Sequence, residues 1–266
     1  MTAPLFHLEP GALAGASAGA EVVFDGAEAR HAAAAMRLAP GEAVLLADGS
    51  GTLGHGTVLA AAPDAVTVRL DTVAEEPAPT PALVLVQALA KGDRDLMAVQ
   101  AAVELGVDAV VPWEAERSIV RWKGPKAAKA RQKWADTARA AAKQARRARV
   151  PAVRDHVSGT AVAGLVRDDD GGRLVLVLHE DAEHGVSAVP AERLSAAAEI
   201  AVVVGPEGGI AEDELAALRT VLAQMSAKHS GATGERNEWG NPAERFERFG
   251  SQRIYNPSAF HTVRYF

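Results

Sequence analysis

The pattern of hydrophobic and polar positions changes character near residue 75. Before that point, short apolar runs are separated by turn-forming residues such as Asp48-Gly49-Ser50-Gly51. The predicted strands are Ala43–Ala47, Gly54–Ala60 and Ala65–Leu70. A helical stretch, Ala27–Leu38, precedes them and is stopped by Pro40 and Gly41. We therefore expect residues 1–74 to form a small, mainly β domain.

The alternating prolines of residues 75–81 are typical of a stiff linker, and a different period begins after them. The predicted strands are now Leu83–Leu89, Val107–Pro112, Leu174–Leu178 and Ile200–Val204, and the predicted helices are Arg94–Leu105, Pro125–Val150 and Ala211–Gln224. We expect Asp93 to cap the first helix and Gly106 to end it. Strands that alternate with helices predict an α/β domain over residues 82–224, with a parallel sheet covered on both faces.

Residues 225–266 have a different composition from the rest of the chain. Alanine becomes rare, while all three Asn, both Tyr and four of the six Phe lie in this segment. The pattern suggests only one short helix, near Pro242–Phe249. We therefore expect a divergent tail after the α/β domain.

Composition narrows the class of protein. The chain has 266 residues, of which 48% are hydrophobic, enough to fill the cores of two domains. It contains no Cys, which excludes disulfides and thiolate ligands, and its eight His show no paired spacing, so we expect no metal site. The N-terminus lacks a signal-peptide pattern, and no apolar run reaches eighteen residues. These features favour a cytoplasmic protein without a membrane partner.

Positive charge is concentrated in one segment, although the net charge of the chain is −6. Residues 121–149 hold eleven Lys or Arg and a single acid, Asp136. Solvated helix faces usually mix both signs, so this segment favours the phosphates of RNA or DNA. Arg139, Lys143 and Arg147 follow one another at intervals of four and are expected to share one helix face.

The stretch Gly205–Ile210 links a predicted buried strand to a predicted helix, which is the usual frame of a ligand site in an α/β sheet. Its glycines allow a ligand to lie against the backbone. A phosphate loop would need Lys and Ser or Thr after the last Gly, where Ile210 and Ala211 stand, and Glu207 would repel phosphate. The loop therefore suits a neutral or cationic ligand, such as a nucleoside joined to a sulfonium, and the alternative is a plain strand-to-helix turn.

Several stretches together resemble one family of RNA-modifying enzymes. The stretches are Gln87–Asp93, Glu104–Val107, Val111–Trp113, Arg117-Ser118, Arg121-Trp122, Ala141–Arg147, Leu178–Glu180 and Val204–Ile210. In order and spacing they resemble the RsmE family, the 16S ribosomal RNA uracil-N3 methyltransferases of the SPOUT superfamily. The likeness runs from about residue 4 to about residue 222, and residues 225–266 do not match the family's ending.

The resemblance implies a fold and a set of site residues. It implies a PUA-like β-barrel for RNA, an α/β domain with a trefoil knot that the divergent tail leaves in question, a homodimer, and S-adenosylmethionine as cofactor. The residues it places at the cofactor are Leu178, His179, Gly205, Pro206, Glu207 and Gly208. The catalytic candidates are Arg147, Gln144 and Glu207, and the RNA-binding candidates are Arg30, Arg37, Arg117, Arg121, Lys123, Arg139, Lys143, Arg146 and Arg147.

The implied activity is methyl transfer to N3 of a uridine in 16S ribosomal RNA of the small ribosomal subunit. In this interpretation Arg147 stabilises the uridine anion, Gln144 contacts a base edge, and Glu207 is one candidate for the general base. The alternative is a non-catalytic RNA-binding protein with an incomplete cofactor site. A nucleotide-phosphate enzyme is a third hypothesis, which the missing Lys and the presence of Glu207 both oppose.

Overall fold

The computed structural model describes residues 3–165, 172–182, 184–230 and 263–265. The chain forms two compact units, and each is described by itself. The first unit consists of Met1–Leu83, Asp93–Val110 and Trp122–Arg154, and the second of Val84–Gly92, Val111–Arg121 and Asp155–Phe266. These units do not follow the linear domain boundaries expected from the sequence, and those boundaries stay a prediction.

The first unit contains a β-barrel-like sheet with the strand order β1-β3-β4-β5-β2. Its strands are β1 (Leu5–His7), β2 (Glu21–Asp25), β3 (Ala43–Ala47), β4 (Thr52–Ala61) and β5 (Ala65–Glu75). Buried and exposed residues alternate along β4, as expected for a strand with one face on a core. That core gathers around Phe6, Leu46, Val66 and Leu70.

Tight local geometry explains two features of this sheet. A Cβ on Gly56 would lie 2.5 Å from Cγ1 of Val68 and 2.6 Å from the carbonyl oxygen of Arg69, so only glycine fits where β4 crosses β5. The turn before β4 is held by Asp48, whose Oδ1 accepts the backbone N–H groups of Ser50 and Thr52 at 2.9 and 3.1 Å. Burial raises the pKa of Asp48, but these hydrogen bonds outweigh burial and leave the pKa below its ordinary value.

The helices of the first unit are α1 (Gly26–Arg30) with a π-helical turn at His31–Ala35, α2 (Arg94–Glu104) and α3 (Pro125–Gln144). Helices α2 and α3 pack on one another, and the short strand β8 (Ala152–Val153) follows. Gly106 has a φ of 107° just after α2, as predicted for a helix-ending glycine. Asp93 precedes α2 but makes no side-chain cap, so this part of the prediction was wrong; its Oδ1 instead accepts a hydrogen bond from Nζ of Lys133 at 2.9 Å.

Helix α3 ends earlier than the pattern predicted, at Gln144 instead of Val150. Arg146 takes a φ of 57°, and the amides of Arg146 and Arg147 bond the carbonyl oxygens of Lys143 and Ala142 at 3.1 and 2.9 Å. These two bonds form a Schellman motif, which ends a helix. Arg147 therefore lies outside the helix, and the prediction that it shares a face with Arg139 and Lys143 was wrong.

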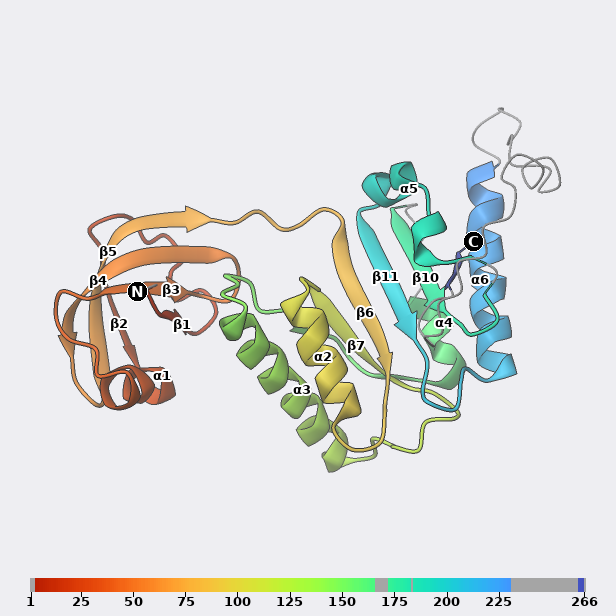
Figure 1. Ribbon diagram of the computed structural model, residues 1–266, viewed down its shortest axis with the longest axis horizontal. Coiled ribbons are helices and arrows are strands. Elements are labelled where there is room, and N and C mark those ends of the chain that lie inside the picture. The colour runs from red at the N-terminus through yellow and green to blue at the C-terminus, as the bar shows by residue number, and fades with distance from the viewer. Residues whose placement is uncertain (1–2, 166–171, 183, 231–262, 266) are drawn as a thin grey trace, which may run out of the picture. The chain divides into compact units, whose positions relative to one another are not determined.

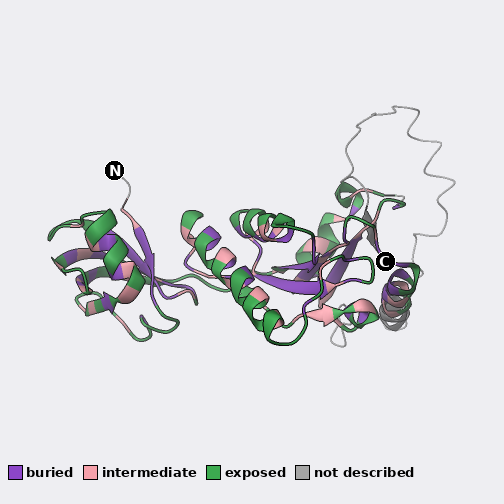
Figure 2. Ribbon diagram, turned by 90° about the horizontal axis from the view of Figure 1, so that it is seen from below, coloured by how far each residue is buried: buried purple, intermediate pink, exposed green. Residues whose placement is uncertain are grey.

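The larger sheet contains most strands of the second unit (Figure 1). Its strand order among the described residues is β12-β10-β11-β6-β7-β8, with β9 paired to β7. The strands are β6 (Ala82–Ala88), β7 (Ala109–Glu114), β9 (Val157–Ser158), β10 (Arg173–Leu178), β11 (Glu199–Val204) and β12 (Val263–Tyr265). Strands β10 and β11 are parallel, and Figure 2 shows the central strands as mainly buried. The structure thus confirms the predicted α/β fold with a parallel sheet.

The remaining helices of the second unit are short except for the last. They are 3-10 turns at Gly159–Ala161 and Val186–Ala188, and helices α4 (Val162–Leu165), α5 (Ala191–Ala196) and α6 (Glu212–Ser230). Helix α6 packs against α4 and runs six residues beyond its predicted end. No described helix is both long and apolar enough to cross a membrane.

The divergent tail contributes one element that the sequence did not predict. Strand β12 pairs antiparallel with β10, with Tyr265 opposite Leu176 and Val263 opposite Leu178. The helix suggested near Pro242–Phe249 lies outside the described residues, as do residues 231–262 as a whole. The knot depends on that part of the chain, so it stays a prediction.

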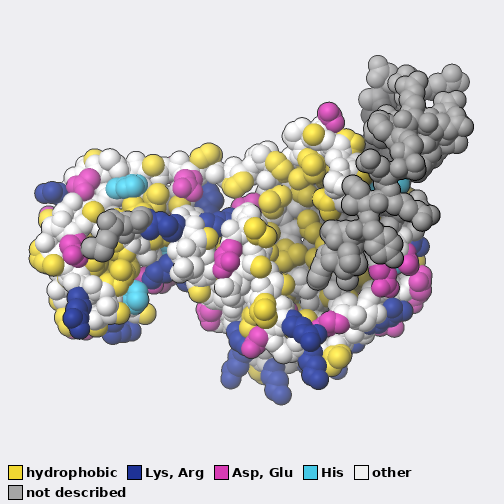
Figure 3. Space-filling view, viewed as in Figure 1, with side chains coloured by type: hydrophobic (Ala, Val, Ile, Leu, Met, Phe, Trp, Pro, Cys, Tyr) yellow, Lys and Arg dark blue, Asp and Glu magenta, His cyan; other side chains and the backbone are white. Residues whose placement is uncertain are grey.

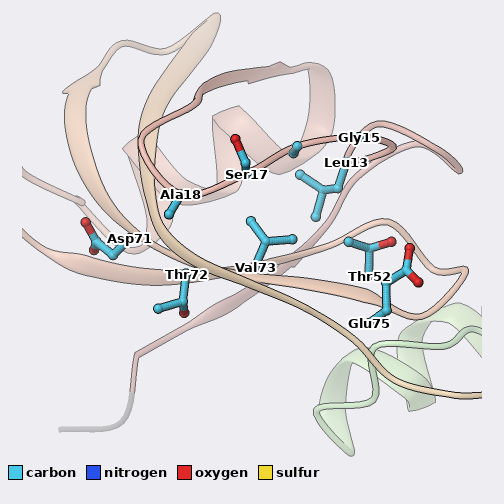
Figure 4. A pocket seen from close by; sticks show the side chains of 10 residues that line it. Leu13, Gly15, Ser17, Ala18, Thr52, Asp71, Thr72, Val73 and Glu75 are labelled. Atoms are coloured by element: carbon cyan, nitrogen blue, oxygen red, sulfur yellow. The ribbon is translucent and has the colours of Figure 1, made fainter.

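The barrel of the first unit carries an open pocket of about 550 Å³ (Figure 4). Leu13 from the loop after β1 and Val73 from β5 point toward one another across it. Asp71 and Glu75 also line the pocket, and none of its lining residues is Lys, Arg or His. Arg69 lies 4.0 Å from Asp71 but does not line the pocket, and a lining with two carboxylates and no cation repels phosphate, so we do not place the expected RNA backbone contacts in this pocket.

Candidate functional site

The glycine-rich loop of the second unit begins at the carboxyl edge of the parallel sheet. Leu178, the last residue of β10, lies opposite Val204, the last residue of β11. His179 and Gly205 therefore leave the sheet at the same edge, side by side. The carboxyl edge of a parallel sheet is where α/β folds bind their ligands.

The loop keeps its apolar side chains inward and its polar backbone outward. Pro206 and Ile210 are buried, whereas Glu207 and Gly208 are exposed. The amide of Gly209 donates to the carbonyl oxygen of Pro206 at 2.9 Å, and its φ of 78° requires glycine. A Cβ on Gly205 would lie 2.7 Å from Cγ1 of Ile210, so this position also needs glycine. The result is a tight loop in which the exposed carboxylate of Glu207 lies next to the exposed glycine backbone of Gly208.

A second loop, residues 115–121 after β7, forms a wall beside the glycine-rich loop. Nη1 of Arg117 donates to the carbonyl oxygen of Gly208 at 3.1 Å, and a Cβ on Gly208 would lie 3.5 Å from Cβ of Arg117. The guanidinium of Arg121 donates to the carbonyl oxygens of Ala115 and Glu116 at 2.6 and 2.7 Å. Both arginines thus hold backbone within this unit, and contact with RNA remains a prediction for each of them.

Glu214 is a residue of this site that the sequence pattern did not reveal. It lies in the first turn of α6 with 1% of its surface exposed. One carboxylate oxygen accepts the amide of Glu116 at 2.7 Å and the other accepts the amide of Ala211 at 3.2 Å. Its place as the third helical residue was a signal for a capping role, but the contact with Glu116 is 98 positions away in sequence and has no local signal.

His179 is held in one orientation. Its Nδ1 accepts the backbone amide of Asp181 at 3.2 Å, and 11% of the side chain is exposed. Because Nδ1 acts as the acceptor, the ring N–H is on Nε2. Leu178 is half-buried just before it. The two residues therefore offer an apolar surface and one ring N–H donor at the sheet edge.

The basic residues of the first unit divide into two groups. Lys143 and Arg147 are half-buried and engaged within the unit. Nζ of Lys143 bonds both carboxylate oxygens of Glu28, at 2.9 and 2.7 Å, and lies 5.3 Å from the ring centre of Phe6. The guanidinium of Arg147 donates to the carbonyl oxygens of Val103 and Val107 at 3.0 and 2.6 Å.

Arg147 also pairs with Asp108 at 3.1 Å, and only 17% of its side chain is exposed. A guanidinium that already has these three acceptors has little left for a substrate. The structure therefore supports a role for Arg147 in holding the segment after α3 in place.

The other group of predicted RNA contacts is exposed. Arg30, Arg37, Lys123, Arg139, Gln144 and Arg146 all belong to it. Figure 3 shows Lys and Arg side chains projecting together near the start of α3. Arg37 and Arg146 are the non-glycine residues of the described chain with positive φ, at 53° and 57°. Strained backbone beneath two exposed arginines is a feature often found at functional positions.

His7 anchors the end of the basic helix to the barrel. It is 4% exposed, and its Nε2 donates to the carbonyl oxygen of Arg147 at 2.8 Å. Burial lowers the pKa of His7, and nearby Arg139 and Lys143 lower it further, against the opposing effects of the Arg147 carbonyl and Glu28. His7 is therefore held neutral.

The chemistry of the two surfaces differs. The loop at the sheet edge presents glycine backbone, the carboxylate of Glu207 and the ring of His179, a set that fits a ligand with a polar nucleoside part and a positive centre. The exposed cations of the first unit fit a polyanion. Among the described residues no group of three or more His, Asp or Glu side chains is arranged to hold a metal ion.

Known proteins match the chain along most of its length. A family described as RNA methyltransferase domain matches residues 76–226, and one described as RNA methyltransferase PUA domain matches residues 24–71. Ribosomal RNA small subunit methyltransferase E of Mycobacterium tuberculosis is 40% identical over 201 residues, which are 75% of this chain and 76% of the relative. The Bacillus subtilis protein of the same name is 30% identical over 194 residues, 71% of this chain and 75% of the relative.

A solved structure agrees with these sequence matches. Ribosomal RNA small subunit methyltransferase E from Neisseria gonorrhoeae, bound to S-adenosyl methionine, superposes with a TM-score of 0.69 and 25% identity over 83% of this chain and 86% of that protein. A methyltransferase from Legionella pneumophila shares the fold at a TM-score of 0.67 and 23% identity, over 83% of this chain and 86% of that one. The chain belongs to the RNA methyltransferase family that includes ribosomal RNA small subunit methyltransferase E.

Proposed function

We propose that the chain methylates N3 of a uridine in 16S ribosomal RNA of the small ribosomal subunit, using S-adenosylmethionine. Family membership supports ribosomal RNA as substrate, and the Neisseria gonorrhoeae relative is bound to S-adenosyl methionine. The observation that carries the proposal is the glycine-lined loop with an exposed carboxylate at the carboxyl edge of the parallel sheet. We place the reaction in the cytoplasm, and propose that the chain acts as a homodimer.

The residues proposed for the cofactor are Leu178, His179, Gly205, Pro206, Glu207 and Gly208. They fit it for a structural reason: Gly208 has no side chain to cover its exposed backbone, which lies close to Arg117, and Glu207 adds negative charge beside that backbone. A sulfonium is attracted by a carboxylate, whereas the phosphate of a nucleotide is repelled. When bound, S-adenosylmethionine supplies an electrophilic methyl group.

The exposed basic residues of the first unit are proposed to bind RNA. Arg139 and Arg146 present guanidinium groups to solvent around the end of α3, and Gln144 is exposed between them. Arginine bonds phosphate in a fork geometry, and a glutamine amide can read a base edge. Arg30, Arg37 and Lys123 are exposed as well and extend the proposed surface.

The chemistry places two demands on the protein. N3 of uracil carries a proton at neutral pH, so that proton must leave as N3 bonds the methyl carbon. N3 also lies in the base-pairing edge, so the uridine must be unpaired to reach the site. The protein contributes positioning and charge, because holding N3 in line with the methyl group removes much of the entropic barrier. Glu207 is exposed and remains our candidate to accept the proton.

For Arg147 we propose a positioning role in place of direct stabilisation of the uridine anion. Its guanidinium is already bonded to two carbonyl oxygens and to Asp108. These bonds fix the backbone that follows α3, and Arg146 is exposed on that backbone, two residues after Gln144 at the end of α3. Charge stabilisation of the anion is then left to an exposed guanidinium, for which Arg146 is the candidate.

Methyl transfer to ribosomal RNA tests the proposal. Small subunits from cells that lack the enzyme are incubated with the purified chain and tritiated S-adenosylmethionine, and the product is mapped by reverse transcription. N3 methylation blocks base pairing, so we expect tritium in 16S RNA and a transcription stop at one uridine. RNA binding without transfer would instead support a non-catalytic RNA-binding protein, and label without a stop would refute N3 as the target.

A matched pair of variants locates the cofactor. Gly208→Leu adds a branched side chain against Arg117, in the part of the loop where we place the cofactor, and should abolish cofactor binding. Gly164→Leu adds the same group in α4, where nothing lies within 4 Å of an added Cβ, and should leave binding unchanged. Equal affinity of both variants for S-adenosylmethionine, measured by calorimetry, would remove Gly208 from the proposed site.

A further inference from the structure

A buried carboxylate joins the two loops that flank the proposed cofactor site. Glu214 is 1% exposed and accepts one backbone amide on each oxygen, that of Ala211 at the start of α6 and that of Glu116 in the loop after β7. An ionised carboxylate is an acceptor only, so both of its oxygens suit these two donors. Removing it would leave two amides without their acceptor, that of Ala211 at a buried site and that of Glu116 at a partly buried one.

Helix capping alone does not account for this residue. In a capping box the side chain of the third helical residue accepts the amide of the N-cap residue, and the N-cap side chain in turn accepts the amide of the third residue. Here the residue before α6 is Ala211, which has no side-chain oxygen to accept the amide of Glu214. The second oxygen of Glu214 bonds Glu116 in a different loop, at 2.7 Å, which is the shorter of the two contacts.

The same loop after β7 holds the glycine-rich loop at a second point. Arg117, next to Glu116, donates from Nη1 to the carbonyl oxygen of Gly208 at 3.1 Å. Residues 116 and 117 are thus tied to the glycine-rich loop at Gly208 and, through Glu214, to its end at Ala211. The short stretch 208–211 includes two glycines with little intrinsic rigidity, and it is fixed between these two ties.

We propose that Glu214 is a positioning residue for the cofactor loop. Its carboxylate fixes the distance between the loop after β7 and the end of the glycine-rich loop, so the backbone groups that receive the cofactor are arranged before it binds. A loop that is already in its bound conformation loses less entropy on binding, and this preorganisation raises affinity. The inference rests on the proposed function, because it assigns the cofactor to this loop.

The test compares Glu214→Gln with two controls in the same helical turn. The amide of Gln has one oxygen, so one of the two backbone amides faces an NH₂ group instead of an acceptor. Glu212→Gln and Asp213→Asn make the same chemical change at exposed positions. Glu214→Asp is a second variant, which keeps the charge but is too short to reach both amides. All are made in the full-length chain, and binding of S-adenosylmethionine is measured by calorimetry well below the unfolding temperature.

We expect Glu214→Gln to raise the dissociation constant for S-adenosylmethionine about tenfold, the lower end of the range seen when a group that orients metal ligands is removed. Because both hydrogen bonds of Glu214 go to backbone amides, we expect it to act on cofactor binding: the KM for the cofactor should rise while turnover at saturating cofactor stays within about threefold of wild type. Glu214→Asp should change affinity in the same direction, and the two controls should not.

Other outcomes would overturn the inference in distinguishable ways. A lower unfolding temperature with unchanged cofactor affinity in either Glu214 variant would show a purely structural role. Equal decreases in affinity in the controls would show that the net charge of the turn, and not the two ties, sets the affinity. If the wild-type chain itself does not bind S-adenosylmethionine, the proposed function fails, and the inference fails with it.

Discussion

Arg146 occupies the left-handed position just after α3, where helices most often have glycine, and replacing it with glycine should stabilise the protein. Its φ of 57° lies in the left-handed region, which costs a residue with a Cβ about 1–2 kcal/mol. Glycine loses that strain but gives the unfolded chain more freedom, which costs about 0.5–1 kcal/mol. Both Schellman bonds use backbone amides, so Arg146→Gly keeps them. We expect the free energy of unfolding to rise by about 0.5–1 kcal/mol, the difference between these two effects.

The assay is urea unfolding followed by tryptophan fluorescence. Trp122 and Trp134 are buried in the same unit as Arg146, with ring centres 5.5 Å apart, and they report on its unfolding. The matched control is Arg139→Gly, which removes the same charge from the interior of α3, where glycine should destabilise by about 1 kcal/mol. Affinity for 16S RNA, measured at several salt concentrations, should fall in both variants, and the salt slope should decrease by about one for each phosphate that is no longer neutralised.

The opposite signs of the two stability effects make the reasoning refutable. A stability decrease in Arg146→Gly as large as that in Arg139→Gly would show that the left-handed backbone carries no strain. A gain in stability without any change in RNA affinity would agree with backbone strain at Arg146 but would show that its side chain does not bind RNA. Only a gain in stability combined with weaker RNA binding agrees with a strained residue kept for its side chain.

Three further predictions concern the packing of the first unit. Arg147→Ala should lower the free energy of unfolding by about 2–3 kcal/mol, because Asp108 and two carbonyl oxygens lose their donor, and Arg147→Lys should not restore it, both measured by urea unfolding. His7 has a lowered pKa in the folded chain, so just below pH 6.5 only the unfolded chain gains a proton. The free energy of unfolding should therefore be highest above pH 6.5 and fall as the pH drops toward the folded pKa. Between pH 8 and pH 5.5 it should fall less in a His7→Gln variant than in the wild type. Gly56→Ala should destabilise by more than about 2 kcal/mol in the same assay, because its Cβ would overlap Val68 and backbone, and a decrease of less than about 0.5 kcal/mol would contradict that geometry.

The sequence predicted elements well where the signal is periodic and local. Strand β3 was predicted with its observed bounds, and β10, β11 and α2 to within one residue at each end. Apolar period and capping residues are properties of neighbouring positions, so they can be read without the fold. The glycine-rich loop was found in the same way, because a buried strand, a break and a helix follow one another directly.

Helix ends were predicted less well because they depend on residues without a fixed signature. The end of α3 has an arginine in the position that glycine usually takes, so nothing in the local sequence marked it. Helix α6 continues past Gln224 to Ser230, beyond the point where the apolar spacing fades. Strand β12 forms only by pairing with β10, and a three-residue strand has too few positions to show a pattern.

The sequence by itself determined the fold class, the glycine loop with its acid and the basic segment, because each rests on residues close together along the chain. It also determined the family, through the order and spacing of several short motifs. Only the tertiary structure decided what individual charges do. In the folded chain Lys143 pairs with Glu28, 115 residues away, and Arg147 pairs with Asp108, 39 residues away. Glu214 accepts the amide of Glu116, 98 residues away. A charge is used for folding or left for a ligand according to which partner the folded chain brings near it, and no local pattern records that partner.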